Sequence, residues 1–255
     1  MYVVALAVCN AIYQFSPMMD LLSNVHGRWW MGKPLCDLHN YLTSVGSASQ
    51  ICIHVSISVN RLWAVHSPIS YRQHHNRKVA LLICFAAVLF AHLIELPGCV
   101  LDALYYSIDY LEHGCHVDYM KQILWSHFDF ALHALTLMFI IVAYVHLCIN
   151  RWKRHRKNAV YTSGNESGAS DRQNTRKEAS KPFLVLSLTA VSCFIFWTPG
   201  IVSFGTIKYS GKWIPENVLS VAMTMYSIQA IFDPWLFAFS VLATKKKWSL
   251  AGFGK

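Results

Sequence analysis

Six long apolar runs, separated by polar stretches, organise the chain of 255 residues. Each run holds about 20 or more predominantly apolar residues, the length that an α-helix needs to cross the hydrocarbon core of a bilayer. The pattern therefore predicts six transmembrane helices, at about 2–22, 35–65, 79–100, 123–149, 182–207 and 214–242. The first run has no basic segment before it and is too long for the apolar part of a signal peptide, so we expect no cleavable leader here.

Polar residues divide the runs into two kinds. The third run is the most apolar, and its two interruptions, His92 and Glu95, lie three apart and are expected to pair. The second run is the most polar and contains Thr43, Ser44, Ser47, Ser49, Gln50, His54, Ser56 and Ser58. Small and hydroxyl side chains let helix backbones approach closely and bond to one another. We therefore expect the second helix to be enclosed by other helices.

Composition and charge support a membrane protein. Hydrophobic residues make up 55% of the chain and charged residues 14%, whereas a soluble domain carries about 25% charged residues. If the spans alternate, 17 of the 22 Lys and Arg residues fall on one side of the membrane and five on the other. The positive-inside rule places the larger group, and with it both chain ends, in the cytoplasm. Membrane topology thus accounts for the net charge of +9, and no nucleic-acid partner is expected.

The chain divides into a bundle, a loop and a tail. We interpret residues 1–242 as one transmembrane bundle. Within it, residues 151–181 are predicted to form a flexible cytoplasmic loop, because the stretch Tyr161–Ser180 is polar and rich in Ser and Gly. Residues 243–255 are predicted to form a short cytoplasmic tail.

The eight cysteines show no paired CxxC spacing, which argues against a zinc ribbon. Six lie within or at the ends of apolar runs. Cys36 and Cys115 lie in polar stretches, and they are the natural disulfide pair if both face an oxidising compartment.

Two other membrane-protein classes fit the sequence poorly. A di-iron enzyme would need repeated HxxHH boxes, and His74-His75 lie in a basic loop without them. The stretch His113–His116 has donor atoms for zinc, but only if Cys115 is not in a disulfide. A channel or transporter is disfavoured because the chain shows no arginine ladder, selectivity-filter sequence or internal repeat.

Five short motifs occur in a fixed order along the predicted spans. They are LAVCN at Leu6–Asn10, WMG at Trp30–Gly32, NRLWAVHSPISY at Asn60–Tyr71, FWTP at Phe196–Pro199 and DPWLF at Asp233–Phe237. In this order the chain resembles the rhodopsin-like (class A) G-protein-coupled receptors, whose corresponding motifs include LAxxD, DRYxAVxxPLxY, CWxP and NPxxY. The motif style is similar to that of peptide receptors. The longest match, Asn60–Tyr71, is the most specific.

The sequence departs from the family pattern at several positions. The first helix and the fourth-helix tryptophan have no counterpart, and Thr136 stands where the fifth helix usually has proline. Asn60 replaces Asp, and Phe237 replaces Tyr. These departures bear on how strongly the chain would couple to a G protein more than on whether it belongs to the family. The resemblance implies an all-α membrane protein with six of the seven helices of a receptor bundle, followed by a short amphipathic helix near Lys245.

The resemblance also implies particular site residues. A disulfide is expected between Cys36 and Cys115. The activation and G-protein coupling residues are expected to be Asn60, Arg61, Tyr144, Trp197, Pro199, Asp233, Pro234 and Phe237. The polar interior is expected to contain Asn10, Gln50 and Asp233. Because Asn10 and Asp233 look like a reciprocal exchange of the family's acid and amide, we expect these two side chains to meet.

The expected ligand pocket comprises Thr43, Asp129, His133 and Phe204. Asp129 and His133 are four residues apart, and they either form hydrogen bonds between helices or place a carboxylate before a cationic ligand group. Thr43 stands where amine receptors have their aspartate, so a monoamine ligand is not expected. The sixth run contains no retinal-binding lysine, so a photopigment is not expected either.

The implied function is transduction of an extracellular ligand, favoured to be a peptide, to a heterotrimeric G protein at the plasma membrane. Arrestin, receptor kinases and membrane lipid are further implied partners. No catalytic residue, metal or cofactor is expected. Two alternatives stay open: a truncated fragment or isoform that associates with full-length partners without signalling, and a channel or transporter.

Overall fold

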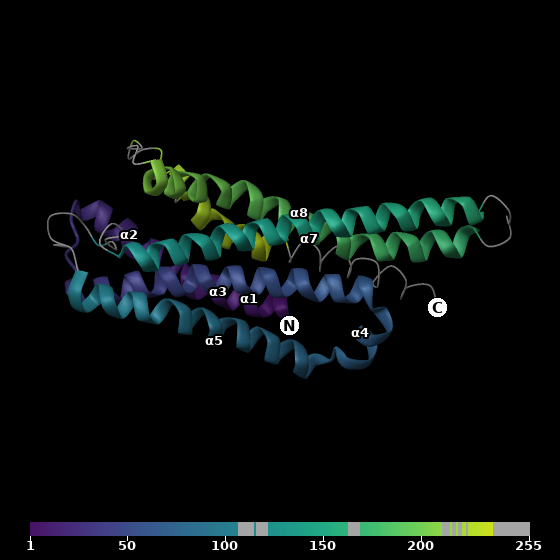
Figure 1. Cartoon of the computed structure of the whole chain (residues 1–255), viewed down its shortest axis with the longest axis horizontal. Helices are drawn as coiled ribbons and strands as arrows, with labels where there is room; N and C mark the ends of the chain where they lie inside the picture. Colours follow the sequence, from purple (N-terminus) through teal and green to yellow (C-terminus); the bar gives the residue numbers. More distant parts are fainter. Residues whose placement is uncertain are drawn as a thin grey trace, which may run out of the picture.

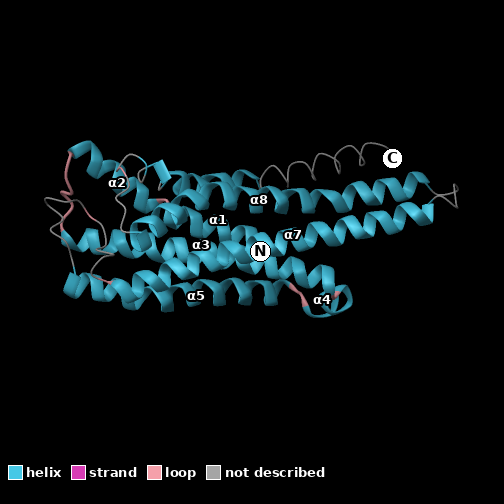
Figure 2. Ribbon diagram, turned by 45° about the horizontal axis from the view of Figure 1, so that its top comes forward, coloured by secondary structure: helices cyan, strands magenta, loops and turns pink. Residues whose placement is uncertain are grey.

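A computed structural model describes residues 1–106, 115, 122–162, 169–210, 215, 218, 221–222 and 224–236, with the backbone alone at 154–162, 169–187, 208 and 210. Every regular element among these residues is a helix (Figure 2). The long helices lie roughly along one axis and form an elongated bundle (Figure 1). The architecture is therefore all-α, as predicted.

The first predicted span consists of two helices in series, α1 (Tyr2–Tyr13) and α2 (Phe15–His26). The break at Gln14 has a local cause. Pro17 has no N–H to bond the carbonyl four residues earlier, and its ring crowds that carbonyl. The second helix ends at Gly27, whose φ of 69° is the left-handed conformation that favours glycine at a helix C-terminus.

The second predicted span is α3 (Lys33–His66), which begins after Gly32 and has Pro34 in its first turn. Proline suits this position because the first N–H groups of a helix have no partner within the helix. This helix packs against α1, α2, α4, α5 and α7. It is enclosed by other helices, as its polar composition predicted.

A short helix that the apolar pattern did not predict, α4 (Pro68–His74), follows α3. The third span is α5 (Arg77–Leu101), whose chain continues as one turn of π-helix, η1 (Asp102–Tyr106). The side chain of Asn76 accepts a hydrogen bond from the backbone N–H of Val79 at 3.0 Å. This bond satisfies an otherwise free donor and fixes the start of α5.

The last two labelled helices, α7 (Ile123–Thr162) and α8 (Ala169–Ser210), are longer than the predicted spans. They extend past the bundle at the end where α4 lies (Figure 1). Helical backbone therefore takes in most of residues 151–181, which were predicted to be a flexible loop. The flanks of that segment are rich in Lys, Arg, Glu and Ala, which are strong helix formers even where no apolar pattern is present.

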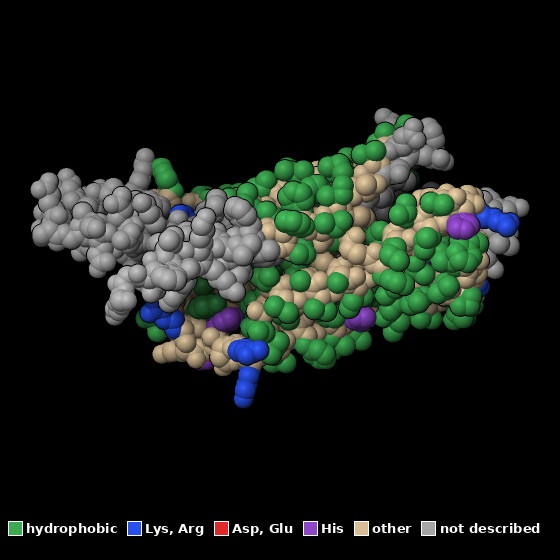
Figure 3. Space-filling view, turned by 180° about the vertical axis from the view of Figure 1, so that it is seen from behind, with side chains coloured by type: hydrophobic (Ala, Val, Ile, Leu, Met, Phe, Trp, Pro, Cys, Tyr) green, Lys and Arg blue, Asp and Glu red, His purple; other side chains and the backbone are tan. Residues whose placement is uncertain are grey.

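Five helical segments among the described residues are long and apolar enough to cross a membrane: Tyr2–His26, Lys33–His66, Arg77–Tyr105, Ile123–Lys153 and Leu188–Ile207. The sixth predicted span lies partly outside the described residues, and its described stretch at 224–236 is helical. Figure 3 shows hydrophobic side chains spread over the middle of one face, with Lys and Arg towards its ends.

Two glycines allow close contact between neighbouring helices. A methyl group added at Gly46 of α3 would lie 2.4 Å from Cδ2 of Tyr13 on α1. One added at Gly98 of α5 would lie 2.0 Å from Cε2 of Trp125 on α7. Because real carbon atoms do not approach so closely, these positions set how α1 and α7 pack.

Candidate functional site

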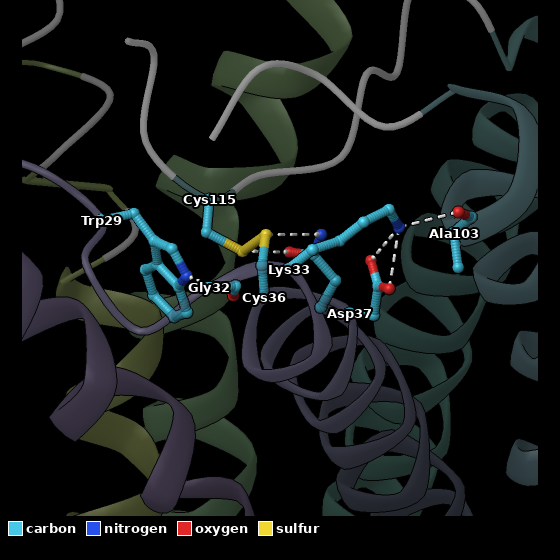
Figure 4. Close-up of polar contacts among 8 residues, drawn as sticks. Trp29, Gly32, Lys33, Cys36, Asp37, Ala103 and Cys115 are labelled. Carbon is cyan, nitrogen blue, oxygen red and sulfur yellow. Dashed lines mark hydrogen bonds and ion pairs between the residues drawn. A yellow bond between two sulfur atoms is a disulfide. The ribbon is translucent and has the colours of Figure 1, made fainter. Parts of the chain in front are cut away.

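The predicted disulfide joins Cys36, at the start of α3, to Cys115, 79 residues later. Trp29 packs beside it in a buried cluster with Met19 and Cys36, and its indole Nε1 donates to the carbonyl of Gly32 at 2.9 Å (Figure 4). Cys99, in contrast, is a free, buried thiol. The disulfide and the tryptophan thus hold the start of α3 at this end of the bundle.

A lysine links the same end of α3 to the end of α5. The Nζ atom of Lys33 lies 2.8 Å from Oδ2 of Asp37 and donates to the backbone carbonyl of Ala103 at 2.8 Å (Figure 4). The carbonyl belongs to η1, so one ammonium group bonds two elements.

A row of hydrogen bonds runs inward from this end between α2 and α3. The carboxylate of Asp20, whose side chain is 53% exposed, lies 3.2 Å from Nε2 of His39. The other ring nitrogen of His39, Nδ1, lies 2.8 Å from Oγ of Ser16. The Ser16 hydroxyl bonds that of Thr43, which also donates to the backbone carbonyl of His39 at 2.9 Å. The row therefore reaches from an exposed acid to Thr43.

Thr43 forms part of the wall of a cavity of about 100 Å³ between α1, α3, α7, α8 and the helical segment 224–236. This volume holds roughly three water molecules. All four residues predicted to form the ligand pocket line it, namely Thr43, Asp129, His133 and Phe204. A more open depression of about 420 Å³ beside Pro199 has almost entirely apolar walls and includes none of the four.

Asp129 and His133 form a pair on the cavity wall. Nδ1 of His133 lies 3.2 Å from Oδ1 of Asp129 and also donates to its backbone carbonyl at 2.9 Å. The pairing is within α7, so it is not the bond between helices that the sequence left open. The carboxylate therefore has a cationic or donor partner on its own helix.

A second acid lies near this pair. Glu95 of α5 is fully buried, and neither carboxylate oxygen has a hydrogen-bond partner among the described residues. It is close enough to Asp129 and His133 for their charges to act on it. The predicted pairing of Glu95 with His92 is wrong, because Nδ1 of His92 lies 2.7 Å from the hydroxyl of Tyr41 on α3.

Aromatic rings connect the cavity to the middle of the bundle. Tyr226, on the cavity wall, stacks on Trp197 with ring centroids 5.9 Å apart. Trp197 is fully buried and meets the ring of His54 edge to face at 5.5 Å. Because these rings are close-packed, a displacement of Tyr226 would shift Trp197 and, with it, His54.

A buried polar cluster lies at the end of this row of rings. Nε2 of His54 lies 2.8 Å from Oδ2 of Asp233, and the two side chains are 3% and 0% exposed. Gln229 donates to Oδ1 of Asp233 at 3.3 Å and to the sulfur of Cys193 at 3.0 Å. The cluster thus joins α3, α8 and the segment 224–236.

His54 was not among the predicted site residues. A signal for it existed: a buried carboxylate needs a donor or a positive partner, and His54 is the basic side chain in the middle of the second apolar run. The sequence does not reveal which of several polar side chains on that helix faces Asp233.

The predicted meeting of Asn10 and Asp233 is wrong. The amide of Asn10 donates to the backbone carbonyl of Ala230 at 3.0 Å. Pro234 lacks the N–H that would bond this carbonyl within the helix, so Asn10 supplies the missing donor. Asn10 and Gln50 are buried as expected, but Oδ1 of Asn10 and both polar side-chain atoms of Gln50 have no partner among the described residues.

Two of the predicted coupling residues, Asn60 and Arg61, lie near the end of α3 that leads into α4. Asn60 is buried, and its Oδ1 atom and the Nε atom of Arg61 have no hydrogen-bond partner within the described part of the chain. Asn60 therefore does not hold Arg61 through that oxygen. Tyr144 is half-buried on α7, and Pro199 follows Trp197 by two residues on α8. Phe237 and the stretch from Lys245 lie outside the described residues.

Comparison with known proteins places these features in one family. The family model described as "7 transmembrane receptor (rhodopsin family)" matches residues 1–237. The gonadotropin-releasing hormone receptor of Octopus vulgaris is 29% identical over 129 residues, which cover 50% of this chain and 31% of that protein. The tyramine receptor Ser-2 of Caenorhabditis elegans is 24% identical over 133 residues, covering 52% of this chain and 29% of that protein.

A third relative, the G-protein coupled receptor homolog K2 of swinepox virus, is 24% identical over 110 residues, covering 43% of this chain and 29% of that protein. The matched regions thus span about three-tenths of each relative's length. The family match, in contrast, covers almost the whole chain. Together with the apolar helices, it shows a multi-pass membrane protein that is a receptor and not an enzyme. The chain belongs to the rhodopsin family of seven-transmembrane receptors.

Proposed function

We propose that this protein binds an extracellular peptide through the cavity between α3, α7 and α8 and passes the signal to a cytoplasmic heterotrimeric G protein. One observation carries the proposal. The four residues expected to form the ligand pocket line one cavity. Tyr226 on the wall of this cavity contacts Trp197, which in turn contacts the buried pair of His54 and Asp233. The proposed ligand site and the cluster that joins the helices are thus linked by packed aromatic rings.

The size and charge of the cavity favour a peptide with a basic group. With about 100 Å³, the cavity admits a group of side-chain size, so most of a ligand would lie outside it. Asp129 of α7 lines the cavity and Glu95 of α5 lies close to Asp129, whereas α3 presents Thr43 with its hydroxyl already bonded. A cationic side chain of the ligand would meet Asp129 and compete with His133 for it.

The cytoplasmic side of the proposal rests on Arg61. An arginine near the membrane's inner face is costly in lipid and so meets water or a protein partner. Because Asn60 carries no charge, it cannot hold Arg61 in an ion pair. We therefore propose measurable coupling to G proteins without ligand. We also propose location in the plasma membrane, with receptor kinases and arrestin acting on Tyr161–Ser180, which contains six Ser and Thr residues.

The test measures ligand-free exchange of GTPγS on a panel of purified G proteins, in membranes from cells that express the chain. We expect exchange above that of membranes without the chain. Asn60→Asp should lower it, because a carboxylate can pair with the neighbouring guanidinium, and Arg61→Ala should abolish it. Arg28→Ala, which changes an arginine at the opposite end, is the control and should leave exchange unchanged.

Surface biotinylation establishes that each variant reaches the cell surface in equal amount. If the parent chain reaches the surface but produces no exchange on any G protein, the proposed coupling is wrong. That result would favour the non-signalling fragment or isoform. An increase of exchange in Asn60→Asp would contradict the role proposed for Asn60.

A further inference from the structure

Two histidines from different helices face each other near the inner end of the bundle, and the proposed function does not use them. His66 is the last residue of α3, and His146 lies on α7. Their Nε2 atoms are 2.7 Å apart, and their rings are stacked with centroids at 4.8 Å and an angle of 23° between planes. Both side chains are exposed.

The short distance brings the two Nε2 atoms into one small volume. A single hydrogen lies between the nitrogen atoms, since one neutral imidazole donates and the other accepts. If the donating ring instead carries its hydrogen on Nδ1, both Nε2 atoms become free to act as ligands, with no net loss of protons. Two such nitrogens are the donor set that divalent ions of the zinc class prefer.

We propose that His66 and His146 form a binding site for a divalent transition-metal ion such as Zn²⁺, which bridges α3 and α7. Zinc bonds imidazole nitrogen at about 2.0–2.1 Å, and two such nitrogens at a tetrahedral angle lie about 3.3 Å apart. The two nitrogens, now at 2.7 Å, would have to separate by about 0.6 Å to reach that spacing. The nearly parallel rings would also have to turn until both lone pairs point at the ion.

The helices position the two rings independently of any metal. One turn before His66, Trp63 packs edge to face against Tyr71 of α4 with centroids 5.5 Å apart, which fixes the turn after α3. Next to His146, Leu147 is buried and packs α7 into the bundle, while the His146 ring stays exposed. The site is therefore preformed on two packed helices, which lowers the cost of ordering the ligands.

The donor set makes this an open site. The described residues contain no group of three or more His, Cys, Asp and Glu side chains that could hold a metal. Water would complete the coordination, as in zinc sites with free positions. We therefore expect reversible binding that responds to the metal concentration, and a bound ion would hold the inner end of α3 to α7.

Titration of Zn²⁺ into the purified full chain in nanodiscs, without a polyhistidine tag, tests the site against a zinc-competing indicator dye. The variants His66→Gln and His146→Gln keep a hydrogen-bonding amide but remove one nitrogen ligand. Removal of a residue that only hydrogen-bonds a metal ligand lowers metal affinity about 10- to 100-fold. Removal of a ligand itself should therefore lower the affinity of each variant for Zn²⁺ at least about tenfold. His74→Gln, on exposed α4, is the matched control and should bind as the parent does.

A second measurement follows the melting temperature. Zn²⁺ should raise it in the parent and in His74→Gln, but not in the other two variants, because a ligand that binds the folded state stabilises it. If the parent binds Zn²⁺ no more tightly than His66→Gln and His146→Gln do, the proposal is overturned. Neither measurement involves a G protein, so the outcome is independent of the proposed function.

Discussion

Asp233 and His54 decide the chemistry of the bundle interior at the scale of single residues. An isolated carboxylate in a low-dielectric interior is strongly destabilising, and a paired one is tolerated only with good geometry. Here the 2.8 Å contact from His54 and the donor from Gln229 meet both carboxylate oxygens. The pair also joins α3 to the segment 224–236, so loss of either residue affects two helices.

A double-mutant cycle on His54→Leu and Asp233→Asn tests this pair. Removal of one partner of a buried ion pair costs about 3–5 kcal/mol, so each single variant should unfold at clearly lower temperature. The double variant should recover part of the loss, because it leaves no unpaired charge. Thermal unfolding in detergent and surface expression are the readouts. As a control, His92→Leu with Asp233→Asn should be additive, since His92 bonds Tyr41. Additive effects of His54→Leu and Asp233→Asn would show that the two do not interact.

Proline shapes the helices at the scale of elements. Pro17 separates α1 from α2, and Pro234 leaves the carbonyl of Ala230 without a bond in its own helix. Asn10 of α1 fills that vacancy with its amide at 3.0 Å. The carbonyl that Pro234 leaves unbonded in its own helix thus accepts a hydrogen bond from another helix. This bond explains why position 10 carries an amide.

Asn10→Asp tests this role, because an ionised carboxylate accepts hydrogen bonds but does not donate them. The variant should lose about 1–3 kcal/mol, the usual cost of a buried polar group without its partner. The combined exchange Asn10→Asp with Asp233→Asn should be no more stable than Asn10→Asp alone. Melting temperatures of the purified variants give the comparison. Recovery in the combined variant would instead support direct contact between positions 10 and 233.

Glycine contacts set the spacing between helices. In Gly98→Ala the added methyl group would lie 2.0 Å from the indole ring of Trp125, and overpacking of this kind typically costs about 1–3 kcal/mol. Gly200→Ala on α8 is the control, because nothing lies within 4 Å of the added methyl. There the higher helix propensity of alanine should leave stability equal or slightly greater. Equal unfolding temperatures for the two variants would show that α5 and α7 do not approach as closely as the contact between Gly98 and Trp125 requires.

At the scale of the whole molecule, the two ends of the bundle carry different kinds of contact. The end with the disulfide is fixed by a covalent bond and by Lys33, which binds both Asp37 and the carbonyl of Ala103. The end with α4 holds the proposed coupling residue Arg61 and the histidine pair. In the proposed function, a signal that begins at the first end would reach the second through the packed interior, where His54 and Asp233 lie.

The apolar pattern by itself determined the class of the protein. Bilayer thickness fixes the length of a spanning helix, so the apolar runs could be located from the sequence alone. Their basic flanks predict the orientation. Spaced motifs were equally readable, because residues such as Cys36, Trp197 and Pro199 keep their place along a helix whatever surrounds them. Thr43, Asp129, His133 and Phe204 were grouped through the family resemblance, and they line one cavity.

Only the tertiary structure decided which polar side chains meet. A sequence gives the position of a residue along its helix, but not the rotation of that helix against its neighbours. For this reason Asp233 was assigned to Asn10, whereas His54 bonds it, and Glu95 was assigned to His92, which bonds Tyr41 instead. The end of an apolar run also marks the end of burial and not of the helix, so α7 and α8 continue beyond the predicted spans. Periodicity and length are properties of one segment and can be read from its sequence. The hydrogen-bond partner of a side chain depends on how several segments pack against one another, which is fixed only in the folded bundle.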